Sequence, residues 1–264
     1  MNIDILICTL NEGIEKVPSV LMSPIEGVRY IVCMQYTNEE ALDKVPMKML
    51  TRKDVKLYIH EGVGICKNRN FALEWTDADI CVIADDDNRY TPESINIIRK
   101  AYEERPDIDI ICFKSESYDG KAMKKYPMKA MPYAEALEQG YHPYSIEITM
   151  RRNVNTRFDE RFGLGSEQLC AGEEDVFLKD AENNNYNILF VPETIVKTYP
   201  ITTGTKFLNN KKLQITKGAT FKYIFGKKEA IWRSVKEAGW WMVHKGANPF
   251  PIIMNMIKGI WLFK

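Results

Sequence analysis

The chain has 264 residues, of which 45% are hydrophobic and 27% are charged, and its formal net charge is zero. This length and composition allow a full-sized buried core and exclude a disordered protein. The six cysteines are dispersed without a CxxC pair, which excludes a zinc ribbon and a dense disulfide framework and favours a reducing compartment.

Short apolar runs rich in β-branched residues predict the strands of the first half of the chain. The first is "IDILIC" at residues 3–8, which has no basic leader and is expected to be a buried strand. The next runs lie at residues 29–35, 55–59, 79–84 and 108–113. Helical spacing occurs at residues 65–76 and 92–104, and Thr91 and Pro92 suit the start of the second helix. This alternation predicts an α/β fold with a mostly parallel sheet covered by helices.

Polar residues gather after two of these strands, at the edge where a parallel sheet binds its ligands. Thr9, Asn11 and Glu12 follow the first strand, and three consecutive aspartates, at 85–87, follow the fourth. Adjacent like charges repel unless protons, solvent or a cation neutralise them. Carboxylates suit Mg²⁺ or Mn²⁺, which commonly keeps one or two protein carboxylates while phosphate oxygens complete its shell. An isolated "DDDN" run would equally be a solvated turn with a helix cap.

The loop "GVGICKNRN" at residues 62–70 brings further donors and positive charge to the same edge, through Lys67 and Arg69. The chain has no GxxxxGK[ST] motif and no GxGxxG after the first strand. These absences argue against a P-loop nucleotidase and a Rossmann dehydrogenase. A substrate activated by a diphosphate leaving group remains.

In their order and spacing, these motifs resemble an inverting family 2 glycosyltransferase with the GT-A fold. The resemblance rests on a "TxNE"-like motif at 9–12, an "xRNxA" motif at 68–72 and a DxD motif at 85–87. A fourth motif is an acidic pair on the acceptor side, for which "GEEDVFL" at 172–178 is followed by the strand-like "NILFVPE". By itself, "GEEDVF" would be a charged helix start that complements the helix dipole. The resemblance extends over residues 1–200.

The resemblance implies a role for each motif. Asp87, with Asp85 directly or through water, would hold Mn²⁺ or Mg²⁺ against the donor diphosphate, and Asp86 would meet the ribose or the donor sugar. Asp175 would be the base that deprotonates the acceptor, with Glu174 positioning the acceptor or tuning the base. Glu173 leaves the register of this helix open. The other expected nucleotide-sugar contacts are Thr9, Asn11, Glu12, Gln35, Lys67, Arg69 and Asn70.

Two positions depart from the family pattern. Where relatives have an aspartate that reads the nucleotide base after the second strand, this chain has "IVCMQYTNEEAL", so Gln35 or Asn38 would take that role. Where relatives often have a metal-binding histidine, "VPETIVKTYP" places Thr198, which would weaken metal binding or leave a ligand position to water. His60, His142 and His244 lack the spacing of a ligand set and are assigned no role.

The C-terminal sixty residues have a different composition. From Thr205 onward, twelve Lys and Arg residues face two acidic residues, a net charge of +10, which leaves −10 for residues 1–204. Four of the five tryptophans lie there, and helical spacing places Ile231, Val235, Ala238 and Met242 on one face. Basic helices with tryptophans are typical of anionic membrane surfaces, so membrane contact is expected through 219–264. The alternatives are a dimer interface or a cover for the catalytic domain.

The sequence therefore predicts a GT-A domain at 1–204 and a basic helical extension at 205–264. The expected activity is metal-dependent, inverting sugar transfer from a nucleotide-sugar, with a UDP-sugar favoured, to a glycan or lipid-linked acceptor in cell-surface polysaccharide synthesis. A cytoplasmic location is expected, on the inner face of the plasma membrane if the extension binds lipid, with no nucleic-acid partner. The rival interpretations are a sugar-1-phosphate nucleotidyltransferase, whose "GxGTR" loop is absent after the first strand, and a non-catalytic nucleotide-sugar-binding protein.

Overall fold

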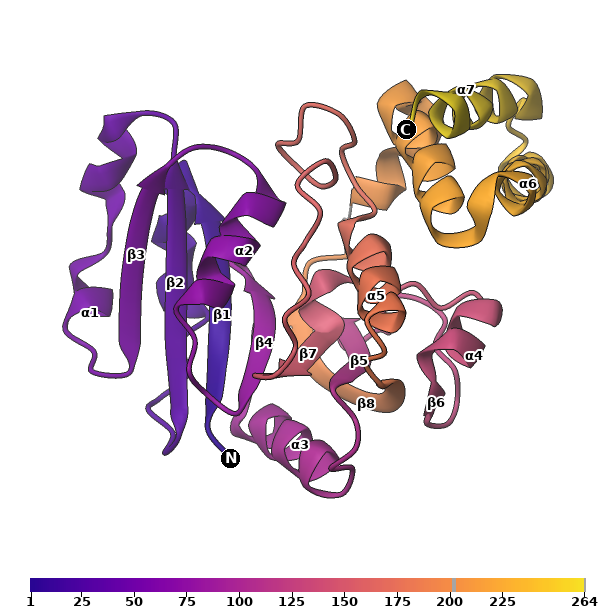
Figure 1. Ribbon diagram of the computed structural model, residues 1–264. Coiled ribbons are helices and arrows are strands. Elements are labelled where there is room, and N and C mark those ends of the chain that lie inside the picture. The colour runs from indigo at the N-terminus through magenta and orange to yellow at the C-terminus, as the bar shows by residue number, and fades with distance from the viewer. Residues whose placement is uncertain (201–202, 264) are drawn as a thin grey trace. The chain divides into compact units, whose positions relative to one another are not determined.

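The computed structural model describes residues 1–200 and 203–263 (Figure 1). Two compact units make up the chain. The first contains Met1–Arg157 and Asp180–Pro200, and the second contains Phe158–Lys179 and Ile201–Lys264. The sequence predicts a boundary near residue 204 and assigns residues 158–179 to the first domain, whereas the contacts assign that segment to the second unit.

The first unit is built on an eight-stranded sheet with the strand order β3-β2-β1-β4-β7-β5-β8-β6. Its strands are β1 (Ile3–Leu10), β2 (Val28–Tyr36), β3 (Val55–Glu61), β4 (Ile80–Asp85), β5 (Ile110–Ser117), β6 (Met131–Pro132), β7 (Ile148–Arg151) and β8 (Ile188–Thr198). Strands β1 to β4 pair in parallel, as do β5 and β8, whereas β7 is antiparallel to both β4 and β5. The short β6 is antiparallel to β8. All five predicted strands and the mostly parallel sheet are confirmed.

Strands β4 and β5 run in the same direction because each is antiparallel to β7, which lies between them in the sheet. The carboxyl ends of β1, β4, β5 and β8 therefore meet at one edge of the sheet. Segments that follow these four strands can approach one another there, although they lie far apart in the sequence.

Short helices connect the strands of this unit. They are η1 (Asn11–Ser19), η2 (Glu39–Lys44), α1 (Met47–Leu50), α2 (Ile65–Glu74), α3 (Pro92–Glu103), α4 (Tyr133–Glu138) and η3 (Ser145–Glu147). The predicted start of α3 is confirmed, because the Ser94 amide donates to Thr91 Oγ1 at 3.1 Å. This capping satisfies a donor that the first helical turn would otherwise leave without a partner.

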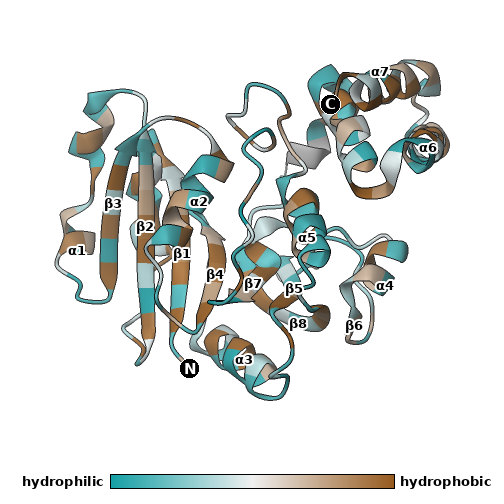
Figure 2. Ribbon diagram, in the orientation of Figure 1, coloured by the Kyte–Doolittle hydropathy of each residue, from teal (hydrophilic) through white to brown (hydrophobic). Residues whose placement is uncertain are grey.

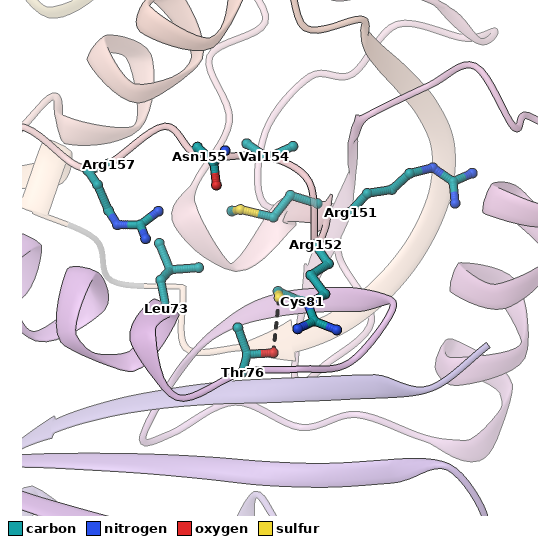
Figure 3. A pocket seen from close by; sticks show the side chains of 9 residues that line it. Leu73, Thr76, Cys81, Arg151, Arg152, Val154, Asn155 and Arg157 are labelled. Carbon is teal, nitrogen blue, oxygen red and sulfur yellow. Dashed lines mark hydrogen bonds between the residues drawn. The ribbon is translucent and has the colours of Figure 1, made fainter.

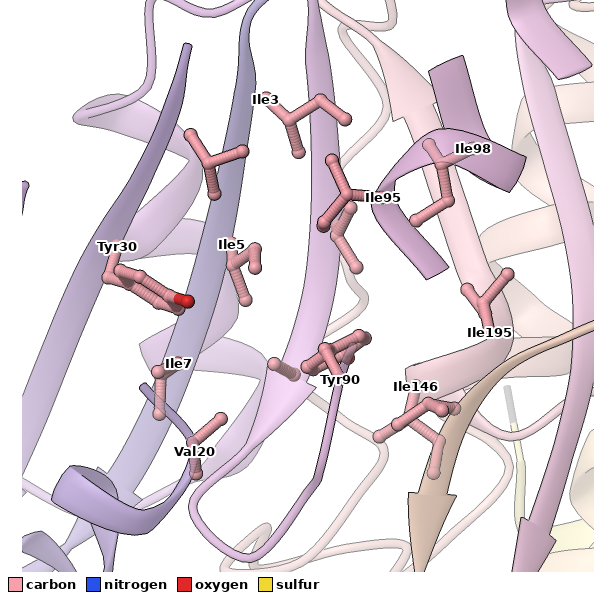
Figure 4. Packing of buried hydrophobic residues seen from close by; sticks show 14 of the residues in the cluster. Ile3, Ile5, Ile7, Val20, Tyr30, Tyr90, Ile95, Ile98, Ile146 and Ile195 are labelled. Carbon is pink, nitrogen blue, oxygen red and sulfur yellow. The ribbon is translucent and has the colours of Figure 1, made fainter. Parts of the chain in front are cut away.

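The core of the first unit lies on the face of the sheet covered by α3. Isoleucines of β1 pack with Tyr30 of β2 and with Ile95 and Ile98 of α3, as Figure 4 shows. Tyr90, from the loop after β4, and Ile146, from η3, join the same cluster. The aspartate turn and η3, which carries Ser145, are therefore each anchored to the core by an apolar side chain.

The second unit is helical. It contains the first part of α5 (Glu173–Asn183), then η4 (Thr203–Asn209), α6 (Lys211–Lys245) and α7 (Pro249–Leu262). Helix α6 is kinked at Gly226, whose φ of 76° is non-helical. Figure 2 shows hydrophobic residues along most of α7. No helix among the described residues is long and apolar enough to cross a membrane.

Residues 158–179 join the second unit because they pack on the first half of α6. Phe162, Leu169 and Val176 form a buried cluster with Ala219. The Cys170 amide also donates to the Thr216 hydroxyl at 3.1 Å. The sequence motifs place residues 158–179 with the first domain because they continue the motif order along the chain. The tertiary contacts place the same residues with the second unit.

Candidate functional site

The three aspartates after β4 lie beside the end of β1. Cys8 of β1 is opposite Asp85 in the sheet, so the next residue, Thr9, reaches the aspartate run. The Thr9 hydroxyl donates to Asp86 Oδ2 at 2.6 Å. All three aspartates are half-buried. The first-strand and fourth-strand motifs, which the sequence predicts to flank one site, are thus in contact.

Asp85 is held from two sides. Buried Arg69 of α2 places its Nη2 atom 3.4 Å from Asp85 Oδ1 and donates from the same atom to Ser145 Oγ at 2.7 Å. The Asp85 amide donates to Asn88 Oδ1 at 2.7 Å. Asn88 is fully buried, and its Nδ2 donates to Thr198 Oγ1 at 3.3 Å. Thr198, in the predicted place of a family histidine, is thereby linked to the aspartate turn.

Asp86 and Asp87 both have a raised carboxyl pKa. Burial raises the pKa of Asp86, against the opposing effects of the Thr9 hydrogen bond and of Lys16, whose Nζ lies 3.7 Å from Asp86 Oδ1. Burial also raises the pKa of Asp87, and the charges of Asp85 and Asp86 raise it further. Among the described residues, the Asp87 carboxylate forms no hydrogen bond or ion pair with another side chain.

This donor set fits a hard divalent cation. Asp87 offers carboxylate oxygens that no described side chain engages, and a cation would relieve the repulsion within the run. The described residues contain no group of three or more His, Cys, Asp or Glu side chains arranged to hold a metal. A cation at Asp87 and Asp85 would therefore need oxygen ligands from a bound substrate or from water.

The carboxyl ends of β1 and β2 are joined by the buried amide of Asn68. Its Nδ2 donates to Thr9 O at 3.1 Å and to Cys33 O at 2.9 Å. Its Oδ1 lies 3.1 Å from His60 Nε2. His60 is opposite Gln35 in the sheet, and Gln35 is itself buried. His60, to which the sequence assigned no role, therefore orients the Asn68 amide.

Asn11 connects η1 to the loop after β2. Its φ of +50° lies in the left-handed region, which asparagine tolerates better than most residues. Asn11 Oδ1 accepts from the Thr37 amide at 2.9 Å. Asn38, the alternative base-reading residue, instead caps η2 by accepting from the Ala41 amide at 3.1 Å. Of the two candidates for reading the base, Asn38 has its side-chain oxygen engaged in this cap, whereas Gln35 is buried opposite Leu10 of β1.

The structure brings together most of the predicted donor-side residues, namely Thr9, Asn11, Gln35, Arg69, Asp85, Asp86 and Asp87. Asn70 is half-buried one position after Arg69 in α2. Glu12 and Lys67 are exposed, and within the described residues neither forms an ion pair with the aspartates. Their predicted contacts with the nucleotide-sugar stay predictions.

Besides His60, sequence reasoning missed Gly13, Lys16 and Asn88. A side-chain carbon at Gly13 would overlap both Asp86 Oδ2 and Thr9 Oγ1. Lys16 approaches Asp86 from the same short helix η1. Only their place in the sequence could have indicated a role, because Gly13 directly follows the "TLNE" motif and Asn88 directly follows the "DDD" motif.

The acidic run at 173–175 forms the first turn of α5. Glu173 is buried, whereas Glu174 and Asp175 are half-buried. All three lie in the second unit. Carboxylates in a first helical turn complement the positive end of the helix dipole. Of the three acids, Glu174 and Asp175 are the ones with access to solvent.

A cavity of about 120 Å³ lies elsewhere in the first unit. Figure 3 shows Thr76 and Cys81 on one side and Asn155 and Arg157 on the other. Cys81 is the second residue of β4, whereas Asp85 is its last, so the cavity lies toward the opposite end of this strand from the aspartates. None of the predicted site residues lines it.

Known proteins match the chain in sequence pattern and in fold. The family description "Glycosyl transferase family 2" matches residues 4–163. A structure of S. aureus TarS 1–349 has a TM-score of 0.61 at 12% identity, covering 99% of this chain and 91% of that one. The same protein in complex with UDP-GlcNAc has a TM-score of 0.58 at 11% identity, with coverages of 99% and 92%.

A longer S. aureus TarS chain has a TM-score of 0.57 at 13% identity; the match covers 93% of this chain and 44% of that one. At these identities the likeness concerns the fold. No curated protein sequence matches the chain significantly.

Proposed function

Because the chain belongs to glycosyltransferase family 2 and has the GT-A fold, we propose that it transfers a sugar, with inversion and with Mn²⁺ or Mg²⁺, from a UDP-sugar to a glycan or lipid-linked acceptor. The observation that carries this proposal is the Asp87 carboxylate. It is half-buried beside two other acids, and no described side chain forms a hydrogen bond or an ion pair with it. By contrast, Asp85 pairs with Arg69, and Asp86 contacts Thr9 and Lys16.

On the donor side, Asp87 and Asp85 would hold the cation, which when bound stabilises negative charge on the departing diphosphate. Arg69 is buried, and its hydrogen bond to Ser145 holds the guanidinium beside Asp85. Its positive charge would therefore be in place before the reaction begins. Lys67 is exposed at the start of the same helix and would add charge from the rim. Thr9 would keep Asp86 oriented toward the ribose or the sugar.

The nucleotide base would lie beside Gln35. A glutamine amide presents one acceptor and one donor group, which complements the adjacent imide N–H and carbonyl groups of uracil. The TarS structures with UDP and with UDP-GlcNAc support a uridine nucleotide on this fold. A UDP-sugar is therefore the favoured donor.

For the acceptor side, we propose Asp175 as the general base. A carboxylate at the start of a helix is held by the helix backbone, which suits a group that must be placed accurately. Glu174 would position the acceptor hydroxyl or tune the base. The burial of Glu173 supports assigning the solvent-accessible roles to its two neighbours.

The acceptor is proposed to be a glycan or a lipid-linked glycan of cell-surface polysaccharide synthesis, met at the inner face of the plasma membrane. The support comes from the second unit, which exposes tryptophans among lysines on α6 and α7. Trp232 and Trp261 are 62% and 64% exposed. Side chains of this kind favour the interface of an anionic bilayer.

The donor site is tested by thermal unfolding with UDP, GDP, dTDP and CMP, each with and without Mn²⁺. A ligand at a hundredfold excess over its dissociation constant stabilises the folded state by about 2.7 kcal/mol. We expect a shift with UDP that requires Mn²⁺ and is lost in Asp87→Ala. Asp107→Ala, an exposed acid ahead of β5, serves as the control and should shift like the wild type.

The acceptor side has its own variant. Asp175→Asn should keep the UDP shift and lose sugar transfer. A protein that shows no nucleotide shift, or one independent of Asp87 and of metal, would contradict the donor assignment. An Asp175→Asn variant with full transfer activity would remove Asp175 as the base and leave the donor site standing.

A further inference from the structure

Two exposed tyrosines lie at the site edge and have no part in the donor site described above. Tyr118 follows β5 directly and Tyr199 follows β8 directly, and the last residues of these strands, Ser117 and Thr198, are paired in the sheet. The two rings meet edge to face, with centroids 4.9 Å apart and an interplanar angle of 65°. Tyr118 is 37% exposed and Tyr199 is 55% exposed.

Tyr118 is fixed to the aspartate turn, and Tyr199 is held there through its contact with Tyr118. The Tyr118 hydroxyl donates to the backbone carbonyl of Asp87 at 2.5 Å. The Arg89 guanidinium lies 5.7 Å from the Tyr118 ring centre. The Arg89 amide donates to Lys197 O and its carbonyl accepts from the Lys197 amide, both at 2.9 Å. The tyrosine pair is thus anchored next to the residue proposed to hold the cation.

Packing within the chain accounts for Tyr118 but not for Tyr199. Tyr118 contacts the turn through its hydroxyl and Arg89 through its ring. Tyr199 meets the Tyr118 ring edge to face, and among the described residues its hydroxyl forms no hydrogen bond. An aromatic side chain that combines an exposed apolar body with a free polar end is suited to a ligand that has both characters.

A pyranose ring has these properties, because its axial C–H groups form an apolar face and its hydroxyls form a polar rim. We propose that Tyr118 and Tyr199 form a platform on which a pyranose ring packs beside Asp87, with the Tyr199 hydroxyl and Arg89 contacting its hydroxyls. This inference rests on the proposed function. The ring belongs either to the donor sugar or to the terminal sugar of the acceptor, and both present the same chemistry to the platform.

The test compares the wild type with Tyr199→Ala, Tyr199→Phe and Trp75→Ala. Trp75 is a matched control, because it is 43% exposed and stacks on a second ring, that of Tyr58, at 4.1 Å. The probes are UDP, UDP-glucose, UDP-galactose and UDP-GlcNAc, titrated calorimetrically with Mn²⁺. A panel of methyl glycopyranosides is added to the UDP-loaded protein and followed by saturation-transfer NMR.

If the platform holds the donor sugar, Tyr199→Ala weakens binding of at least one UDP-sugar by about fivefold and leaves UDP unchanged. If it holds the acceptor sugar, UDP-sugar affinities stay unchanged and the ring-proton signals of a glycoside are lost. In either case Trp75→Ala should behave like the wild type, because Trp75 packs on β3, at the far end of the strand order from β5 and β8. Tyr199→Phe should keep most of the binding, because it retains the ring and loses only the contact made by the hydroxyl.

Unchanged UDP-sugar and glycoside binding in Tyr199→Ala would overturn the platform while UDP binding upheld the proposed function. A wild-type protein that binds no UDP would overturn the proposed function and the platform with it. A Tyr199→Phe variant as weak as Tyr199→Ala would also overturn the platform, since binding would then depend on the hydroxyl and not on the ring.

Discussion

At the scale of single residues, the aspartate run is organised by giving each carboxylate a different neighbour. Asp85 has Arg69, and Asp86 has Thr9 and Lys16. Asp87 has a raised pKa from burial and from its two neighbours. The "DDDN" run is therefore more than a solvated turn, because buried Asn88 and Arg69 hold its first residue in place. Burial and crowding therefore both raise the pKa of Asp87, with Lys16 as the opposing charge.

A substitution at Gly13 tests whether the close approach of η1 to the three aspartates matters for binding. In Gly13→Ala the new methyl group would occupy the space of the Thr9–Asp86 hydrogen bond. Losing one such bond costs about 1 kcal/mol, so UDP binding with Mn²⁺ should weaken about fivefold in calorimetry. Glu15→Ala, an exposed change in the same short helix, should have no effect. Wild-type affinity in Gly13→Ala would show that the close approach does not matter for binding.

At the scale of structural elements, the segment between β5 and α4 is anchored at its middle. Glu147 is fully buried and accepts from Ser115 Oγ at 2.6 Å, Tyr126 OH at 2.6 Å and Tyr141 OH at 3.2 Å. Lys124 Nζ lies 3.0 Å from Glu147 Oε2 and 3.4 Å from the Tyr144 ring centre. The segment is basic and rich in methionine. The structure shows that Lys124 and Tyr126 fix its centre.

Lys124→Met should therefore be destabilising. It leaves the Glu147 carboxylate buried without its cation, and breaking a buried ion pair from one side costs about 3 kcal/mol. Urea unfolding should show this loss, and Lys124→Met combined with Glu147→Gln should recover part of it. Lys129→Met, at an exposed position of the same segment, is the control. Equal stability of the two lysine variants would mean that the pair contributes nothing.

The crossing of α6 and α7 depends on two glycines. A side-chain carbon at Gly218 would overlap the Met256 backbone, and one at Gly259 would overlap the Ile215 carbonyl. The two helices therefore pack backbone against backbone. Sequence patterning could not predict this contact, because a glycine inside a helical pattern is equally compatible with open space, as at Gly239.

Gly218→Ala and Gly239→Ala should act in opposite directions. The first forces α6 and α7 apart, and overpacking of this kind costs about 1–3 kcal/mol. The second adds a better helix former where nothing lies within 4 Å, which should stabilise by about 0.5–1 kcal/mol. Urea unfolding followed by tryptophan fluorescence reports on this unit, since four of the five tryptophans lie in it. Effects of the same sign would contradict the proposed crossing.

At the scale of the whole molecule, the two units differ in charge and in surface. The helical unit leaves large apolar side chains exposed on α6 and α7; these are Ile231, Trp232, Val235, Trp240, Met242, Val243, Phe250, Met254, Trp261 and Leu262. Lysines lie among them, and Lys227 Nζ is 3.3 Å from the Trp261 ring centre. Of the face predicted from helical spacing, Ala238 is buried whereas Ile231, Val235 and Met242 are exposed.

If this surface meets a bilayer, the protein should sediment with phosphatidylglycerol vesicles at low salt and not with neutral phosphatidylcholine vesicles. Its tryptophan fluorescence should shift to the blue. Salt near 1 M shortens the Debye length to about 3 Å and should release much of the protein. Trp232→Ala with Trp261→Ala should weaken binding, whereas Trp75→Ala, in the first unit, should not. Failure to bind the anionic vesicles at low salt would exclude the membrane surface as partner.

The sequence by itself determined strands β1 to β5, the capped helix α3, the GT-A fold and the family, because each depends on local patterns of apolar spacing and on short motifs. It also predicted the residues that gather at the ends of β1 and β4. Only the tertiary structure decided how those residues contact one another. Thr9 and Asp86 are 77 positions apart, and Asn88 and Thr198 are 110 apart.

The same limit explains the difference in domain organisation. Residues 158–179 read as a continuation of the family pattern, yet Phe162, Leu169 and Val176 bury their side chains against α6. Tyr199 likewise carries no sequence signal, and it becomes notable only where the β5–β8 pairing brings it to Tyr118. Contacts of this kind depend on sheet register and helix packing, which distant parts of the chain set jointly and which no local pattern encodes.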